Sequence, residues 1–247
     1  MGGTIRLFKF SGIQVYLHFS WFIVAAIELQ RASLYSSKIW AAYEYILLFL
    51  IVLLHEFGHA LACRQTGGRA EQIVLWPLGG IAFVDPPRRP GAMLWSIAAG
   101  PLVNVLLVPV LWVALRVFAS AAYDHPDLFL LVYQVGQINL LLLIFNLLPV
   151  YPLDGGQILR SLLWFGVGEI RSLQIASVIG LIGAVILAGV ALLFHLMDPI
   201  WVAVLAFFLI SRAIAGWQYS KALVLEEQAK RAAALVPTIP ESERPGL

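Results

Sequence analysis

Five consecutive residues could hold a metal ion and do chemistry with it. His55, Glu56, Phe57, Gly58 and His59 form the pattern H-E-x-x-H in the last third of an apolar stretch. Residues four apart share one face of a helix, so both imidazoles can reach the same ion. Histidine nitrogens are common Zn²⁺ ligands, and the adjacent Glu56 can take a proton from the attacking water. The motif therefore predicts a zinc hydrolase, with Glu56 as the general base.

A catalytic zinc usually has three protein ligands and one open position, so one more ligand is needed. Asp154 is the best candidate, because it follows an apolar stretch that should end on the same side of the membrane as His55 and His59. Glu71 and Asp85 should face that side too. They lie in a loop, where a solvated carboxylate is the ordinary expectation.

Other polar side chains within apolar runs admit more than one interpretation. Cys63 continues the histidine face but lies two turns away, so we interpret it as a packing residue. His18 could be a ligand, a proton carrier or a histidine bonded to neighbouring backbone. Asn104 and Asn146 could bind helices together. Alternatively, such an amide could bind substrate backbone or the oxyanion of hydrolysis, and proximity to Asp154 favours Asn146 for that role.

A purely structural interpretation of the motif is a histidine pair hydrogen-bonded across a helix bundle, with Glu56 in an ion pair. Ionisable groups at the centre of a membrane span cost about 2.5 to 3.5 kcal/mol each on insertion scales, and this motif places three of them close together. The metal site is therefore favoured over the structural interpretation.

Composition sets the environment of the motif. Of 247 residues, 61% are hydrophobic and 12% charged, and the mean hydropathy is +0.87. Such a chain lacks the polar residues to cover a water-soluble surface, so it predicts a multi-span membrane protein in contact with the lipid bilayer. The net charge of +2, scattered over short loops, argues against nucleic acid as a partner. A single cysteine excludes an intramolecular disulfide.

The apolar pattern predicts an all-α polytopic fold with six transmembrane helices. A short membrane-associated β-hairpin is expected between the second and third, from Arg69 to Pro90, with runs Ile73 to Trp76 and Ile81 to Val84 around Pro77, Leu78, Gly79 and Gly80. Residues 1–220 would form the core and 221–247 a cytoplasmic tail, a short helix followed by disorder. The six predicted spans are residues 13–30, 40–63, 92–118, 128–148, 173–194 and 199–220.

The distribution of positive charge predicts the orientation. With six alternating spans, all but three of the 16 Lys and Arg residues (Arg31, Lys38 and Arg116) fall on one side. Because cytoplasmic loops carry the excess of Lys and Arg, both termini should be cytoplasmic, in a protein of the cell membrane. The first apolar stretch lacks a clear cleavage site, so we expect a retained span and no cleaved signal peptide.

Two motifs resemble the site-2 protease family of intramembrane zinc metalloproteases. They are H-E-F-G-H at residues 55–59 and N-L-L-P-V-Y-P-L-D-G at residues 146–155, and Gly100-Pro101 with Asn104 is similar as well. The resemblance covers about residues 5–220. It implies that His55, His59 and Asp154 bind zinc, that Glu56 activates water, and that a six-span core opens the site to the cytoplasmic side. The chain should be a compact form without PDZ or CBS domains.

The resemblance also implies the substrate class. Substrates would be membrane-spanning proteins such as an anti-sigma factor, a membrane-bound transcription factor or a remnant signal peptide. A helical substrate hides its carbonyls in its own hydrogen bonds, so cleavage needs an extended segment. An edge such as Ile73 to Trp76 or Ile81 to Val84 could hold that segment by strand addition. Gly79, Gly80 and Asn146 are the candidate substrate contacts.

Two rival functions use the same residues. One is a membrane zinc protease acting on soluble or prenylated peptides, but these usually take a glutamate as third ligand, and none follows in a suitable span. The other is a metal transporter or metal-sensing membrane protein, which would need polar residues at several depths. The clustering of candidates near one face favours a site over a conduit.

Overall fold

The fold was analysed in a computed structural model that describes residues 3–30, 34–76, 79–120, 122–195 and 198–235. It is a mostly helical membrane protein, and large apolar side chains are exposed along its long helices. Within the described ranges, five helices are long and apolar enough to cross a membrane. They are α2 (Lys38–Gln65), α3 (Pro90–Ala119), α4 (Pro126–Leu147), α6 (Glu169–Leu193) and α7 (Pro199–Leu235).

The predicted first span, residues 13–30, is not one continuous helix. Ile13–His18 forms strand β2, and only Ser20–Gln30 forms a helix, α1. The 11 residues of α1 extend about 16 Å, roughly half the thickness of a hydrocarbon core. The prediction was wrong because high mean hydropathy concealed a period of two. Apolar Ile13 and Val15 alternate with Gln14 and Tyr16, and the two apolar side chains are fully buried.

A four-stranded sheet lies beside the second half of α2, so the fold is mostly helical, as predicted, but contains more β-structure than the one hairpin expected. The predicted hairpin is present as β3 (Arg69–Trp76) and β4 (Gly79–Asp85), although Pro77 and Leu78 at its turn lie outside the described residues. It is joined by a second hairpin, β1 (Thr4–Phe10) with β2, to give the order β1-β2-β3-β4.

The β1–β2 hairpin is closed by a tight two-residue turn. Its central residues, Ser11 and Gly12, both have positive φ values, of 48° and 77°. This left-handed conformation suits the twist of a hairpin and favours glycine. By contrast, β2 and β3 are parallel. Parallel neighbours need a long connection, which here is α1 and α2.

Arg64 joins the C-terminal end of α2 to both hairpins. Its Nε and Nη2 donate to the Ala70 carbonyl oxygen of β3 at 2.9 and 2.6 Å, and its Nη1 donates to the Ser11 carbonyl oxygen in the β1–β2 turn. Beneath these bonds, Ile13 of β2 and Ile73 of β3 belong to one buried cluster with residues of α2. The sheet is therefore fixed to the helix that carries the H-E-x-x-H motif.

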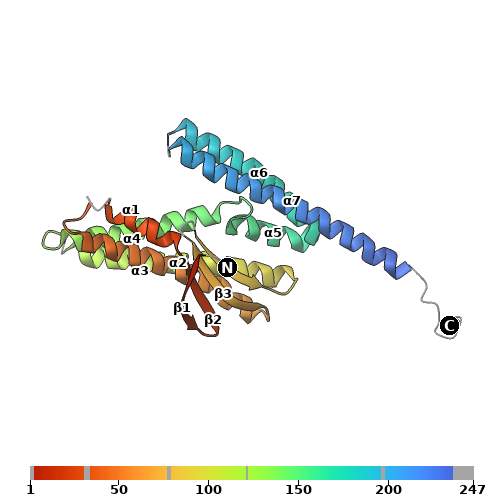
Figure 1. Ribbon diagram of the computed structural model, residues 1–247, viewed down its shortest axis with the longest axis horizontal. Coiled ribbons are helices and arrows are strands. Elements are labelled where there is room, and N and C mark those ends of the chain that lie inside the picture. Colours follow the sequence, from red (N-terminus) through yellow and green to blue (C-terminus); the bar gives the residue numbers. More distant parts are fainter. Residues whose placement is uncertain (1–2, 31–33, 77–78, 121, 196–197, 236–247) are drawn as a thin grey trace.

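Glycines allow the helices around this motif to approach closely. A Cβ atom on Gly58, the fourth residue of the motif, would lie 2.6 Å from the Ala99 carbonyl oxygen of α3. Only glycine permits that contact between α2 and α3. Figure 1 shows α2, α3 and α4 side by side, and α6 with α7 as a long hairpin set apart from them beside α5.

Helix α5 (Asp154–Val167) was not predicted. It lies between α4 and α6, is only 14 residues long and is partly polar, so a search for apolar spans overlooks it. The loop before it docks on the α6–α7 hairpin through Tyr151. A Cβ on Gly180 of α6 would meet the Tyr151 carbonyl oxygen at 2.7 Å, and one on Gly216 of α7 would meet its ring at 2.7 Å.

Helix α7 continues without interruption past residue 220 to Leu235. No break in secondary structure therefore marks the predicted boundary between core and tail. The proline-containing end of the predicted tail, residues 236–247, lies outside the described residues.

Candidate metal centre

The two histidines of the motif project from consecutive turns of α2 into the interior of the protein. His55 and His59 are 4% and 6% exposed, and their Nε2 atoms lie 3.1 Å apart. Glu56 is buried beside them and interacts electrostatically with His59. The spacing of four residues thus does what the sequence predicted, bringing two imidazole nitrogens to one point.

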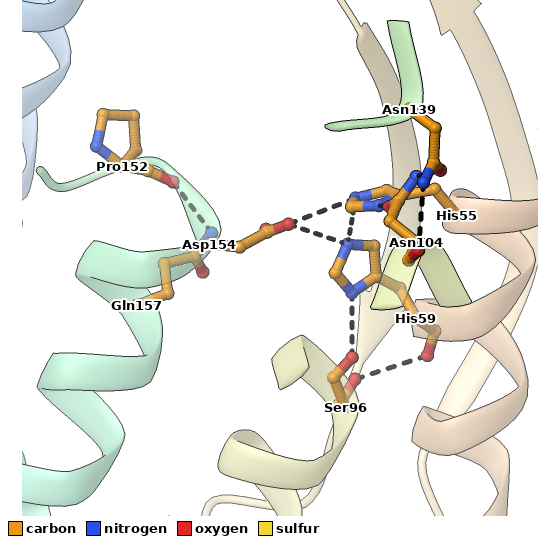
Figure 2. Close-up of polar contacts among 8 residues, drawn as sticks. All are labelled: His55, His59, Ser96, Asn104, Asn139, Pro152, Asp154 and Gln157. Atoms are coloured by element: carbon orange, nitrogen blue, oxygen red, sulfur yellow. Dashed lines mark hydrogen bonds and ion pairs between the residues drawn. The ribbon is translucent and has the colours of Figure 1, made fainter. Parts of the chain in front are cut away.

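Asp154 completes the group, as predicted. Its Oδ2 atom lies 3.1 Å from His55 Nε2 and 3.3 Å from His59 Nε2, and the residue is 9% exposed. Figure 2 shows the carboxylate reaching across from the start of α5 to both rings. Within the described residues, His55, His59 and Asp154 are the one group of three or more such side chains placed to hold an ion.

Backbone packing places Asp154. A Cβ on Gly155 would lie 2.3 Å from the Leu147 carbonyl oxygen, and one on Gly156 would lie 2.3 Å from the Tyr151 nitrogen. Helix α5 can therefore begin directly against the end of α4 only with glycine at both positions. Gln157 Nε2 donates to the Pro152 carbonyl oxygen at 2.9 Å and closes the turn. The D-G-G sequence thus serves to bring Asp154 to the histidines.

The three atoms fit a zinc ion. Zinc bonds of 2.0 to 2.1 Å in tetrahedral geometry put neighbouring ligand atoms about 3.3 Å apart. The edges of the triangle here are 3.1, 3.1 and 3.3 Å. Asp154 Oδ2 is buried and has no hydrogen-bond donor among the described residues. Three unprotonated, electron-rich atoms so close together, one of them a buried carboxylate oxygen, are stabilised by a cation among them.

His59 is oriented by α3. Its Nδ1 donates to the backbone carbonyl oxygen of Ser96 at 2.9 Å, and its Nε2, which carries no proton in the neutral ring, faces the site. Its ring lies against Gly100, where a Cβ would be 2.3 Å from Nε2. The Gly100-Pro101 pair of the sequence therefore has a specific purpose: it leaves room for the imidazole of a ligand.

His55 is oriented by two asparagines, of which sequence analysis identified one. Its Nδ1 lies 2.6 Å from Asn104 Oδ1, and Asn104 Nδ2 donates to Asn139 Oδ1 of α4 at 2.8 Å. Both amides are completely buried. Sequence analysis left open whether Asn104 binds helices together or contacts substrate; in the structure it joins α3 to α4 and also bonds His55. Asn139 was missed, although an amide in the middle of a predicted span was a signal.

Other candidates lie away from this group. Cys63 is buried with its Sγ 3.4 Å from the Arg69 carbonyl oxygen, which agrees with a packing role. His18 Nδ1 accepts from the Ser20 backbone N–H at 3.3 Å, and its ring stacks on Trp76, so its bonding is local. Neither residue joins the metal-binding group, and the same holds for Glu71 and Asp85.

The proposed substrate contacts remain predictions. Asn146 lies half-buried in the last turn of α4, and Asp154 is the first residue of the next helix, α5. Gly80 and Gly79 pair with Leu75 and Trp76 at the start of β4.

Comparison with known proteins places the chain in a family. A model described as "Peptidase family M50" matches residues 43–127 and 116–190, ranges that include His55, His59 and Asp154. The chain belongs to peptidase family M50. Among M50 relatives, the zinc metalloprotease MJ0392 of Methanocaldococcus jannaschii is 38% identical over 180 residues, covering 73% of this chain and 51% of that protein.

One further curated relative and one solved structure extend the comparison. Stage IV sporulation protein FB of Bacillus subtilis is 37% identical over 114 residues, which cover 45% of this chain and 37% of that one. The solved structure of the site-2 protease from Methanocaldococcus jannaschii matches with a TM-score of 0.59 and 30% identity, covering 87% of this chain and 95% of that chain. The chain spans about half the length of the first curated relatives it matches. The absence of PDZ and CBS domains stays a prediction.

The close approach of Gly100 to His59 gives a test of the metal centre. Gly100→Ala places a methyl group where the His59 ring lies, so we expect bound zinc to fall well below one equivalent while the helices still form. Gly136→Ala in α4 is the matched control, because its Cβ meets nothing within 4 Å. It should keep zinc and gain about 0.5 to 1 kcal/mol of stability. Zinc content after dialysis and thermal unfolding measure both, and a full equivalent of zinc in Gly100→Ala would contradict the geometry.

Proposed function

We propose that the protein is an intramembrane zinc metalloprotease that hydrolyses peptide bonds in or near the transmembrane segments of membrane-bound proteins. The observation that carries this function is the buried triangle of His55, His59 and Asp154, built on a membrane-spanning helix and on the turn after another. Membership of peptidase family M50 and the name zinc metalloprotease carried by its relatives support it.

Each residue has a separate chemical task. His55, His59 and Asp154 would hold the zinc, leaving its fourth position open toward substrate and water. When bound, zinc supplies a Lewis acid that activates water and polarises the scissile carbonyl. Glu56 takes a proton from the attacking water on its carboxylate and passes it to the departing amide nitrogen. Burial of Glu56 beside the ligands keeps this transfer away from bulk solvent.

The outer edge of β4 would hold the substrate as an added strand. β4 ends the sheet, pairs with β3 on one side only and packs against α2, the helix of the motif. Unpaired N–H and C=O groups on an edge strand can bind an extended peptide. Gly79 and Gly80, without side chains, would let that peptide approach, and Asn146 would bind its backbone or the oxyanion. Membrane-bound regulators and remnant signal peptides are the substrate classes.

A sixth crossing of the membrane would be made by β2 followed by α1. Strand β2 pairs with β3, which follows the C-terminal end of α2, yet the chain must reach Lys38 at the opposite end of α2. Together β2 and α1 extend about 36 Å, enough for a hydrocarbon core of about 30 Å. Both termini would then lie on the cytoplasmic side of the cell membrane, where most Lys and Arg residues gather.

The role of Glu56 can be separated from metal binding. Glu56→Gln keeps the size of the side chain but cannot accept the proton, so we expect one equivalent of zinc and a loss of about 10² to 10⁴ in the rate of cleavage of a single-span substrate. Asp154→Ala should lose both zinc and activity. Glu71→Gln, an exposed position on β3, serves as the control and should cleave normally. Normal turnover by Glu56→Gln would remove it as the base.

Strand addition to β4 can be tested with proline. Because neighbouring residues of a strand point their N–H groups to opposite edges, separate substitutions Ala82→Pro and Phe83→Pro remove one N–H from the outer edge and one from the β3 ladder. The outer-edge variant should keep zinc and lose about tenfold in cleavage, equivalent to about 1.4 kcal/mol or one hydrogen bond. Leu7→Pro in β1, at the other edge of the sheet, should keep zinc and cleave at the wild-type rate. Unchanged cleavage in both β4 variants would exclude strand addition there.

A further inference from the structure

The two histidine ligands must carry their ring proton on Nδ1, because Nε2 of each faces the metal site. For His59 this is settled directly, since its Nδ1 points at the Ser96 backbone carbonyl oxygen, which can only accept. For His55 the partner is the side-chain amide of Asn104, at 2.6 Å. An amide can present either its oxygen or its nitrogen, so Asn104 alone does not fix the position of the proton.

Asn139 removes this ambiguity. Its Oδ1 accepts from Asn104 Nδ2 at 2.8 Å, and its own Nδ2 donates to the backbone carbonyl oxygen of Asn104 at 3.1 Å. The chain of bonds therefore ends, as for His59, on a backbone carbonyl, which cannot donate. If both amides reversed, Asn139 Oδ1 would face that carbonyl oxygen, and two acceptors would be in contact. Figure 2 shows Asn104 beside His55, with Asn139 above it.

Burial within the membrane means that this series of hydrogen bonds decides which way the Asn104 amide points. Asn104 and Asn139 are 0% and 1% exposed and lie in α3 and α4, two membrane-spanning helices. Neither water nor lipid can bond an amide there, so an unpaired N–H is costly. Without Asn139, the Nδ2 of Asn104 has no acceptor in place and gains one by turning toward His55 Nδ1. His55 would then accept at Nδ1 and carry its proton on Nε2, where the metal should bind.

We propose that Asn139 is a positioning residue of the metal centre, which acts through Asn104 to hold His55 in the tautomer that leaves Nε2 free for zinc. The inference rests on His55 being a zinc ligand, as in the proposed function. It gives the asparagine pair a purpose beyond joining α3 to α4, and it assigns to α4 a part in a site whose ligands come from α2 and α5.

The tautomer can be read in the metal-free protein. The full chain, labelled with ¹⁵N-histidine in micelles and freed of metal by a chelator, should show His55 protonated on Nδ1. In Asn139→Leu a measurable share of His55 should move to the Nε2-protonated form, whereas His59, fixed by Ser96, stays unchanged. Val135→Ala is the control, because Val135 is buried one turn away on the same helix and packs in an apolar cluster that includes none of the three ligands. It should leave both histidines as in the wild type.

Zinc affinity gives the second measurement. By competition with a chromogenic chelator, Asn139→Leu should bind zinc about 10 to 100 times more weakly, the usual effect of removing such a partner. In an Asn104→Leu background, the same substitution should have no further effect, because it acts through Asn104. Asn139→Asp keeps the acceptor for Asn104, and in the neutral form that burial favours, its O–H can donate to the Asn104 carbonyl oxygen. Its His55 tautomer should therefore stay close to the wild type, and this variant carries the test if Asn139→Leu fails to fold.

Three results would overturn the inference: an unchanged His55 tautomer and affinity in folded Asn139→Leu, an equal loss of affinity with and without Asn104, or a shifted tautomer in Asn139→Asp. A wild-type protein that binds no zinc would instead contradict the proposed function. The metal-free spectra distinguish these two failures.

Discussion

The structure depends on one constraint: two imidazole nitrogens and a carboxylate oxygen must face one another inside a membrane protein. When the ring nitrogens are unprotonated these atoms repel one another, and a cation among them removes the repulsion; to bind it, each ring must keep its proton on the far side. The elements around the site meet these needs in turn. Helix α2 supplies both histidines, α3 supplies the acceptor for each ring, α4 supplies Asn139 as the partner of Asn104, and α5 supplies Asp154. Even the sheet contributes, by fixing the end of α2 through Arg64.

Glycine is what allows so many elements to converge on one point. Gly58 lets α3 approach α2, Gly100 leaves space for the ring of His59, and Gly155 with Gly156 lets α5 begin against the end of α4. At each position an added Cβ would lie within 2.6 Å of an atom that cannot easily move, either backbone or a ligand ring. The motifs of the sequence thus combine ligands with the residues that make room for them, which explains why metal-binding residues alone do not define the site.

Much of the site could be predicted from sequence, because its ligands lie in short motifs with fixed spacing. His55 and His59 are four residues apart on a helix, and Asp154 follows a predicted span that ends on the same side of the membrane as the two histidines. The long apolar helices were predictable from hydropathy for the same local reason. The segment 13–30 was not, because burial of β2 in a sheet and burial in lipid both select apolar residues. Asn139 was missed because its partner, Asn104, is 35 residues away and only the packing of α3 on α4 brings them together.

The central claim is that zinc is bound by two histidines and one aspartate. Zinc-edge X-ray absorption on the purified, zinc-loaded protein tests it most directly. The account predicts a four-coordinate ion with two imidazole nitrogens at 2.0 to 2.1 Å, the remaining ligands being oxygen at about 2.0 to 2.2 Å. A sulfur neighbour at about 2.3 Å, which would involve Cys63, or a shell without imidazole scattering would contradict it.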